Sequence, residues 1–360
     1  GEAVHGALAD AGLKLSDVDG LFTGSSYYFL AGLSVAEYLG LKPKFCEATM
    51  VGGSSYVGHL LTAAMALHTG QCEVALICYG SNQGSGFGKL KSMAETPLYE
   101  APYEPRYPIS SYALAAARHM HQYGSTREDL AHIAVAARQW ARLNPLAHAR
   151  EPLSIEQVLA ARLVSDPLSV LDCCLVTDGG GALVLVRSER ARDFPKPPVY
   201  VLGAAAATWH RQIGSMPDLT VTAAAESGPR AFAMAGLAPK DVDVLELYDA
   251  FTINTLLFLE DLGFCAKGEG GAFVRNGRIA PGGALPVNTN GGGLSCCHPG
   301  MYGMFLLIEA VQQLRAEAGA RQVRGAEVAL CHGNGGVLSS QVTALLLSLI
   351  HISEPTRPER

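Results

Sequence analysis

The sequence predicts an α/β fold that is built from two repeated halves. Three observations support this prediction. Residues 11–19 (AGLKLSDVD) and 235–243 (AGLAPKDVD) agree at six of nine positions. Residues 73–76 and 327–330 both read EVAL, and between these matches each half has a glycine-rich turn that enters an apolar helix. Because the matches follow one another in the same order, we interpret them as a duplication and not as chance similarity between helix–loop–strand units.

The elements of the first half follow one another as helix, strand, helix, strand. We expect a helix at 3–11, a short buried strand at 18–23, a helix at 59–67 and a second buried strand at 74–79. The second half repeats this order, with strands at 242–247 and 328–332 and a helix at 304–314 between them. Short apolar strands that are joined by helices pair in parallel, so each half should contain a parallel core.

The middle of the first half departs from this order. Residues 84–170 are more polar and predict helices at 112–124, 127–143 and 155–163, which we interpret as an insertion that covers the active-site side. A strand at 182–187 should end this half. We therefore expect an N-terminal half at 1–190 that lacks its first strand, a C-terminal half at 191–348, and a non-native tail at 349–360.

Composition excludes several classes of protein. Of the 360 residues, 49% are hydrophobic and 17% are charged, so a large core is expected, and the net charge of −6 argues against a nucleic-acid partner. The nine cysteines include no CxxC pair, which argues against a zinc site and for reduced thiols in the cytoplasm. No apolar run is long enough for a membrane helix and no signal peptide is visible, so we expect a cytoplasmic protein without a metal.

Four short motifs in the second half suggest a family. They are Tyr248-Asp249-Ala250-Phe251, His298-Pro299-Gly300 followed by Gly303, Cys331-His332-Gly333, and Asn334-Gly335-Gly336. In this order they resemble the thiolase superfamily, and Asn144-Pro145, Pro167-Leu168 and Asp178-Gly179 of the first half are similar to its sterol-carrier-protein-type branch. The resemblance covers nearly the whole chain. It implies two halves in five α-β-α-β-α layers, catalytic loops that meet between them, and a homodimer.

The departures from the family are informative. Thiolases carry their nucleophilic cysteine at the start of the first-half helix, and the matching residue here is Ser55, which is a far weaker nucleophile unless a base activates it. Tyr248 stands where the family has Asn or His, and Tyr302 stands where it has a small residue. Acyl transfer through a covalent thioester needs the missing sulfur, so the resemblance implies a thioester pocket without its nucleophile.

Such a pocket suits retro-aldol cleavage of a β-hydroxyacyl-CoA. Backbone N–H groups near Ser55 and Gly333 would hold the thioester oxygen, and an acid/base pair would move the protons. We predict Tyr248 and Tyr302 for these two roles, with His298 and Cys331 as supporting donors or bases. The pKa of a free tyrosine, about 10, is poorly matched to neutral pH. Tyr248 therefore needs a lowered pKa or a paired role with His298.

Residues 247–271 look especially like the lipid-transfer-protein-like aldolases of steroid side-chain degradation, which lack the nucleophilic cysteine. That resemblance implies a CoA-linked steroid side chain, no cofactor besides the CoA of the substrate, and a small OB-fold partner protein. Two alternatives stay open: a thiolase or acyltransferase that uses another thiol, and a non-catalytic CoA- or lipid-binding scaffold. Four basic residues are candidates for the CoA phosphates: Lys89, Lys91, Arg106 and Arg275.

Overall fold

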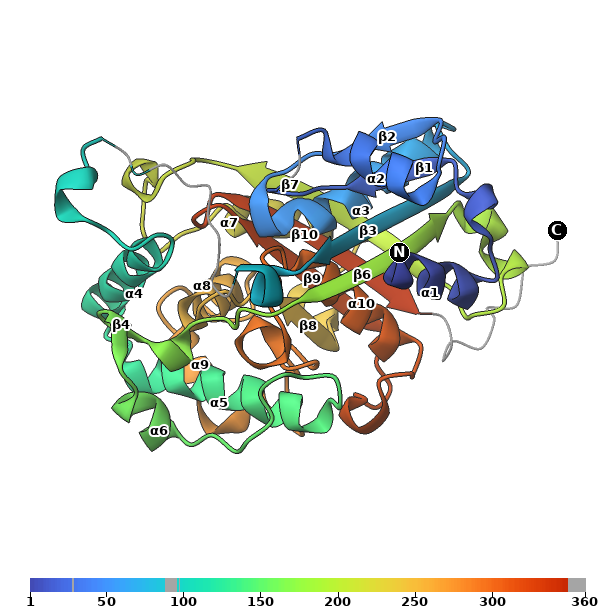
Figure 1. Cartoon of the computed structure of the whole chain (residues 1–360). Helices are drawn as coiled ribbons and strands as arrows, with labels where there is room; N and C mark the ends of the chain where they lie inside the picture. The colour runs from blue at the N-terminus through green and yellow to red at the C-terminus, as the bar shows by residue number, and fades with distance from the viewer. Residues whose placement is uncertain (28, 88–95, 97, 349–360) are drawn as a thin grey trace.

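The computed structural model describes residues 1–27, 29–87, 96 and 98–348, and its two main sheets have four strands each (Figure 1). The first sheet has the order β2-β1-β3-β6. Strand β1 pairs in parallel with both β2 and β3, whereas β3 and β6 are antiparallel. The bounds are β1 Gly20–Thr23, β2 Phe45–Glu47, β3 Val74–Ser81 and β6 Gly179–Val186.

The second sheet repeats this arrangement. Its order is β7-β10-β9-β8, with a parallel β8–β9 pair and antiparallel β9–β10 and β10–β7 pairs. An isolated parallel bridge between Leu245 and Val287 stands where the first sheet has β2. The bounds are β7 Val199–Thr208, β8 Val244–Leu247, β9 Val328–Gly335 and β10 Ser340–Ser348.

Helices form the other three layers. Helices α3 (Ser55–His68) and α10 (Gly303–Leu314) contact each other and both sheets, so they form the middle layer. The outer faces are covered by α1 (Glu2–Ala11) and α2 (Ala31–Leu39) on the first sheet, and by α7 (Ala224–Ala235) and α8 (Thr252–Asp261) on the second. The predicted five-layer α/β fold is therefore confirmed.

One carboxylate in each half ties corresponding strands together in the same way. Asp19 accepts hydrogen bonds from the N–H groups of Glu73 and Val74, at 2.8 and 2.9 Å. Asp243 accepts from the N–H groups of Glu327 and Val328, both at 2.9 Å. Both aspartates lie in the repeated nine-residue sequence, and the residues that donate to them lie in the two EVAL repeats. The duplicated residues thus perform the same structural task twice.

The segment between β3 and β6 carries three helices, α4 (Ile109–Tyr123), α5 (Arg127–Leu143) and α6 (Ile155–Ala160). It also carries a small hairpin of β4 (Leu163–Ser165) and β5 (Leu168–Ser169), so the helix expected at 155–163 ends earlier than predicted. Helices α5 and α4 pack against α8, and α5 also contacts α9 (Gly270–Val274) of the second half. This segment therefore covers the second half of the molecule.

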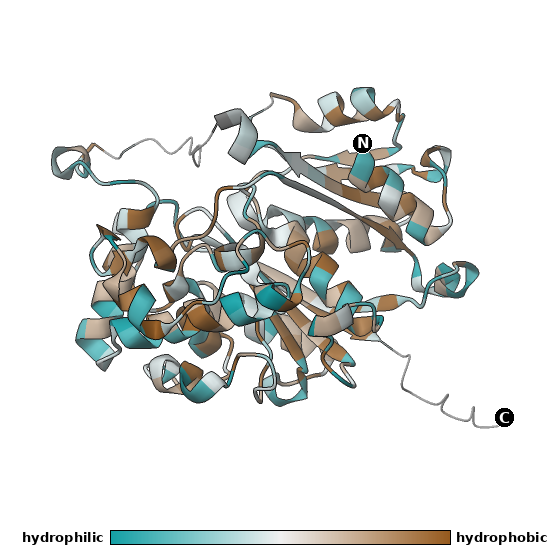
Figure 2. Cartoon of the chain, turned by 60° about the horizontal axis from the view of Figure 1, so that its bottom comes forward, coloured by the Kyte–Doolittle hydropathy of each residue, from teal (hydrophilic) through white to brown (hydrophobic). Residues whose placement is uncertain are grey.

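Hydrophobic residues concentrate along the strands and the inner helices (Figure 2). One core cluster runs from Phe22 and Tyr56 of the first half to Leu330 and Leu345 of the second, so the two halves share a continuous interior. Within the described residues, no helix has the length and apolar character that crossing a membrane requires.

Several expected boundaries differ from the structure, and glycine explains two of them. Helix α3 begins at Ser55, not at 59, because Gly58 continues the helix instead of ending the turn. Strand β9 extends to Gly335, past the predicted end at 332, because the glycines in it permit close backbone contacts. A Cβ atom at Gly335 would lie 1.8 Å from the Val51 carbonyl oxygen. The glycines of β9 thus mark close packing of the two halves.

The Asp19 clamp generates a prediction about stability. Burial alone would raise the pKa of Asp19, but hydrogen bonds from Val74, Glu73 and Lys44 outweigh it and hold the pKa below its usual value. Asp19→Ala should lower the free energy of unfolding by about 2 kcal/mol, because two N–H groups lose a charged acceptor. The stabilisation is present above the unfolded pKa and is lost as the pH falls through the folded pKa.

The difference between wild type and variant in urea unfolding should therefore be full at pH 7 and shrink below about pH 4. Asp243→Ala makes the same change in the second half and should cost a similar amount. An Asp19→Ala protein as stable as wild type at pH 7 would contradict this account of the clamp.

Candidate active site

Tyr248 lies at the seam between the two halves. It follows β8 directly, and its N–H group donates to the His332 carbonyl oxygen of β9 at 2.9 Å. Its ring lies against Gly53, in the turn that leads into α3: a Cβ atom at Gly53 would be 2.2 Å from two of the ring carbons. The buried phenol of the second half therefore occupies the space in front of the first-half helix.

The structure brings Tyr248, His298 and Tyr302 together. The Tyr248 hydroxyl lies 3.0 Å from Nε2 of His298, and it accepts a hydrogen bond from the Tyr302 N–H group at 3.3 Å. The rings of Tyr248 and Tyr302 meet edge to face with 5.9 Å between their centroids. His298 and Tyr302 are stacked at 6.2 Å. We call these three residues the phenol–imidazole cluster.

Two first-half residues hold the loop that carries this cluster. The Tyr79 hydroxyl donates to the Pro299 carbonyl oxygen at 2.5 Å and accepts from the Met301 N–H group at 3.2 Å. The His298 N–H group donates to Oγ1 of Thr177 at 3.0 Å. The position of His298 thus depends on both halves of the chain.

Burial keeps the members of the cluster uncharged. It raises the pKa of Tyr248 well above its usual value, although the hydrogen bond from Tyr302 partly opposes the shift. Burial and the nearby Asp249 also raise the pKa of Tyr302 well above its usual value. Burial lowers the pKa of His298 to about 4, so its imidazole is neutral at pH 7. The pKa of Tyr248 is therefore raised and not lowered. Of the two routes expected for this tyrosine, the geometry permits the paired role with His298.

Asp249 is a further buried acid beside the cluster. Its carboxylate accepts from the Gly293 and Leu294 N–H groups at 2.6 and 3.3 Å. Burial raises the pKa of Asp249 to about 7, and these hydrogen bonds partly oppose the shift. The carboxylate thereby joins the end of β8 to the glycine run that precedes His298.

Ser55 is the first residue of α3, and Gly333 of β9 packs against this end of the helix. The Ser55 hydroxyl donates to the Gly52 carbonyl oxygen at 2.7 Å and accepts from the Val51 N–H group at 3.0 Å. It is thus engaged within its own turn, and among the described residues it forms no hydrogen bond to a basic side chain. A Cβ atom at Gly333 would lie 3.0 Å from the Ser54 Cα, so β9 packs directly on this helix end.

Cys331 is not brought into the cluster. Its side chain points toward the middle layer, where the thiol donates to the Leu306 carbonyl oxygen in α10 at 3.5 Å. Burial raises the pKa of this thiol well above its usual value. Among the described residues it forms no hydrogen bond to Tyr248, His298 or Tyr302. The structure therefore gives no support to Cys331 as a donor or base, because it lies inside β9 and not at the end of the strand.

The sequence reasoning missed four residues of this site: Tyr79, Thr177, Asp249 and Asn290. Asn290 accepts the hydrogen bond of the Tyr302 hydroxyl at 2.8 Å. Beside the His298 loop, residues from both halves also line a cavity of about 460 Å³, among them Val176, Thr177, Cys296 and Cys297. Asp249 stands within a recognised motif and Asn290 within a polar run before the glycines, but nothing in the sequence indicates their partners.

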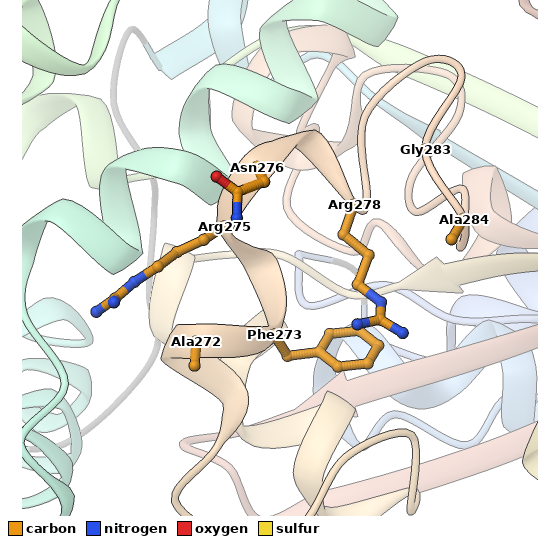
Figure 3. A pocket seen from close by; sticks show the side chains of 7 residues that line it. All are labelled: Ala272, Phe273, Arg275, Asn276, Arg278, Gly283 and Ala284. Atoms are coloured by element: carbon orange, nitrogen blue, oxygen red, sulfur yellow. The ribbon is translucent and has the colours of Figure 1, made fainter.

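Of the four candidate residues for the CoA phosphates, Arg275 does not line this cavity. Arg275 lines a second pocket, of about 320 Å³, in which the Arg278 guanidinium lies 4.3 Å from the Phe273 ring centroid (Figure 3). Arg275 itself is paired with Asp129 at 2.6 Å. Arg106 is exposed, and Lys89 and Lys91 lie outside the described residues.

Comparison with known proteins identifies the class of this site. The family model "Thiolase C-terminal domain-like" matches residues 205–348. A steroid side-chain-cleaving aldolase of Thermomonospora curvata is 39% identical over 87% of this chain and 84% of its own length. A 17-hydroxy-3-oxo-4-pregnene-20-carboxyl-CoA lyase of Mycobacterium tuberculosis is 35% identical over 94% of this chain and 91% of its own length. An acetyl-CoA acetyltransferase of Methanothermobacter thermautotrophicus is 36% identical over 93% of this chain and 90% of its own length.

The solved structures agree with these relatives. A chain of the Ltp2-ChsH2(DUF35) aldolase superposes with a TM-score of 0.88 at 35% identity, over 98% of this chain and 92% of that one. Human mitochondrial 3-ketoacyl-CoA thiolase shows the same fold. It superposes with a TM-score of 0.69 at 17% identity, over 96% of this chain and 91% of that one. The chain belongs to the thiolase superfamily, in its sterol-carrier-protein-type branch.

The contact between Gly53 and Tyr248 generates a prediction about activity. Gly53→Ala places a methyl group within the Tyr248 ring, so the ring must move and activity should fall at least about tenfold. Gly58→Ala is the matched control in the same segment, because a Cβ atom there meets only a Val342 methyl group at 3.9 Å. Turnover with an acyl-CoA substrate and the thermal midpoint measure both effects. Equal activity of the two variants would contradict the placement of Tyr248.

Proposed function

We propose that this protein is a carbon–carbon lyase that cleaves a β-hydroxyacyl-CoA by a retro-aldol reaction, without a covalent acyl-enzyme. One observation carries the proposal: the space before α3 is filled by the phenol–imidazole cluster, and the nearest hydroxyl of the helix, Ser55, is engaged in its own turn. The space before α3 therefore holds groups that can move protons, and it holds no free nucleophile among the described residues.

The geometry supports a simple order of events. The β-hydroxyl proton passes to the Tyr248 oxygen while the Tyr248 proton passes to Nε2 of the neutral His298, 3.0 Å away. The oxygen forms a carbonyl group, the Cα–Cβ bond breaks, and its electron pair forms the thioester enolate. N–H groups at the start of α3 and near Gly333 stabilise the enolate oxygen. A proton returns to Cα, and the products are a carbonyl compound and a shortened acyl-CoA.

Acyl transfer is the second candidate function, because a relative of 36% identity is named an acetyl-CoA acetyltransferase. That reaction needs a nucleophile to carry the acyl group. Among the described residues the Ser55 hydroxyl forms no hydrogen bond to a basic side chain, and burial makes the Cys331 thiol difficult to ionise. These two observations favour the lyase.

The substrate and the partner protein are finer parts of the proposal. Two relatives are named for steroid side-chain cleavage and for a pregnene carboxyl-CoA, which supports a CoA thioester with a steroid side chain as substrate. The similar Ltp2-ChsH2(DUF35) aldolase is named for two components, which supports a partner protein. Its OB-fold type is the part that the family resemblance alone implies. Measuring acyl-CoA cleavage by this chain alone, and again with such a partner protein present, distinguishes the contribution of the chain from that of the partner.

A homodimer is also part of the proposal. Strand β2 is the edge of the first sheet, and apolar side chains are exposed around it: Phe29, Leu30, Leu33, Tyr38, Met50 and Val51. An open edge strand beside apolar residues suits a second copy of the same sheet, since two identical edges can pair around a two-fold axis. Met50 and Val51 lead directly into the turn before α3, so the second copy would lie close to the site.

Tyr248→Phe tests the proposed chemistry. Loss of the hydroxyl removes the group that takes the proton, so cleavage of a β-hydroxyacyl-CoA should fall roughly 100-fold. Ser55→Ala is the matched control and should keep substantial activity. Release of the carbonyl product and the shortened acyl-CoA measures the reaction. Unchanged cleavage by Tyr248→Phe would reject its role, and abolished cleavage by Ser55→Ala would favour an acyl-enzyme.

Leu33→Asp tests the dimer. Light scattering during size-exclusion chromatography should give twice the chain mass for wild type and the single-chain mass for the variant, because a charge at an apolar interface has no partner. Met234→Asp on α7 is the control, since Met234 is equally exposed but lies on the other sheet. A wild-type monomer, or a Leu33→Asp dimer, would contradict the proposed interface.

A further inference from the structure

Two pairs of adjacent cysteines differ in the direction of their side chains. Cys173 forms an extended bridge with Phe251, and in extended backbone successive side chains point to opposite sides. Cys296 instead ends the helical segment Gly292–Cys296, and extended backbone begins at Cys297. Both of these side chains line the same cavity, of about 460 Å³. Cys296 and Cys297 are therefore a pair of thiols that face one space.

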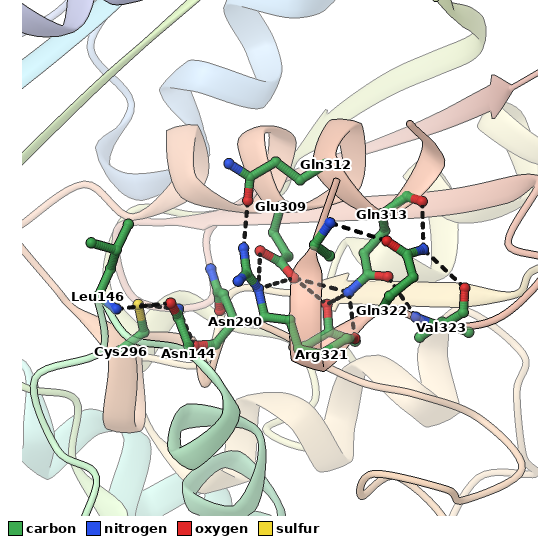
Figure 4. Close-up of polar contacts among 12 residues, drawn as sticks. Asn144, Leu146, Asn290, Cys296, Glu309, Gln312, Gln313, Arg321, Gln322 and Val323 are labelled. Carbon is green, nitrogen blue, oxygen red and sulfur yellow. Dashed lines mark hydrogen bonds and ion pairs between the residues drawn. The ribbon is translucent and has the colours of Figure 1, made fainter. Parts of the chain in front are cut away.

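The contacts of the two thiols give them different roles. Asn144 donates through Nδ2 to Sγ of Cys296 at 3.5 Å, and its amide oxygen accepts from the Leu146 N–H group at 3.0 Å, which fixes the direction of the amide (Figure 4). A hydrogen bond to Cys296, and then burial, raise the pKa of the Cys297 thiol. Cys297 therefore keeps its proton, and Cys296 is the sulfur that attacks an oxidant first. Cys297 is the more exposed of the two and is placed to react second.

The pair is joined directly to His298. The His298 N–H group donates to Oγ1 of Thr177 at 3.0 Å, and the Thr177 N–H group donates to the His298 carbonyl oxygen at 3.4 Å. A disulfide bond holds its sulfurs about 2 Å apart, and adjacent Cα atoms, at about 3.8 Å, are closer than in ordinary disulfides. The backbone of Cys297 must therefore turn to close the ring. Because His298 is the next residue, that turn displaces the imidazole from the Tyr248 hydroxyl.

We propose that Cys296 and Cys297 are a modification site, which hydrogen peroxide converts into a reversible disulfide that stops the reaction by moving His298. The Cys296 sulfur attacks a peroxide oxygen, which gives a sulfenic acid and one water. The Cys297 sulfur then attacks the sulfenic sulfur, the S–S bond forms, and the hydroxyl group leaves as a second water. The thiols lose two hydrogen atoms and two electrons, which the peroxide takes up. The effect on activity rests on the proposed function, whereas the disulfide itself does not.

Peptide mapping tests the site itself. Wild type is treated with hydrogen peroxide, denatured in iodoacetamide and digested with trypsin. The peptide 279–315, whose only cysteines are this pair, should be about 2 Da lighter than its reduced form and unlabelled, and dithiothreitol should restore its labelling. The peptide 163–187, which holds Cys173 and Cys174, is the matched control and should stay reduced and labelled. Full labelling of peptide 279–315 after peroxide, or its linkage to another cysteine, would overturn the proposal.

Activity tests the link to His298. Peroxide should lower cleavage of a β-hydroxyacyl-CoA by wild type at least about tenfold, because a small displacement of a catalytic group is costly, and dithiothreitol should restore it. Cys296→Ser should keep whatever activity it had before peroxide, whereas Cys173→Ser should be inhibited like wild type. Inhibition of Cys296→Ser, or a disulfide without inhibition, would overturn the link. Absence of cleavage by untreated wild type would instead reject the proposed function. If Cys296→Ser does not fold, the peptide map of wild type still decides whether the disulfide forms.

Discussion

The close approach of Gly53 to the Tyr248 ring is the constraint on which the rest of the site depends. The two residues belong to different halves, and no side chain larger than hydrogen fits between them. The same seam is closed by backbone contacts at Gly303, which faces the Gly53 carbonyl oxygen, and at Gly335, which faces Val51. A fold with two stacked sheets and a middle helical layer brings these segments together. The glycines let them come close enough for one half to complete the site of the other.

This constraint explains the chemistry of the site. Burial at the seam removes water from the Tyr248 phenol and the His298 imidazole, so both are neutral and each favours transfer of a proton over a permanent charge. The start of α3 adds N–H groups for a developing oxyanion. The phenol ring lies directly against Gly53, in the turn that leads into this helix. In the proposed reaction, proton transfer and enolate stabilisation take the place of covalent catalysis.

Much of this arrangement was predictable from the sequence, because it depends on local patterns. The repeats at 11–19 and 235–243 predicted the duplication, and the motifs placed Tyr248, His298 and Tyr302 in one site. Asn290 and Tyr79 were not predictable, since their roles arise from contacts with residues far away in the chain: Tyr79 meets Pro299 across 220 positions. Cys331 was chosen from its Cys-x-Gly motif, which does not show that its side chain lies in the middle layer, with the thiol on the Leu306 carbonyl oxygen. The direction of the tyrosine pKa shifts depends on burial, which the sequence does not give.

The central claim is that the reaction proceeds without an acyl group on the protein. Intact-protein mass spectrometry of the wild type, quenched during turnover of an isotopically labelled β-hydroxyacyl-CoA, tests this claim most directly. The account predicts that labelled product accumulates while the protein keeps its unmodified mass at every time point. A protein species that gains the mass of the acyl group, and then loses it as product forms, would contradict the account.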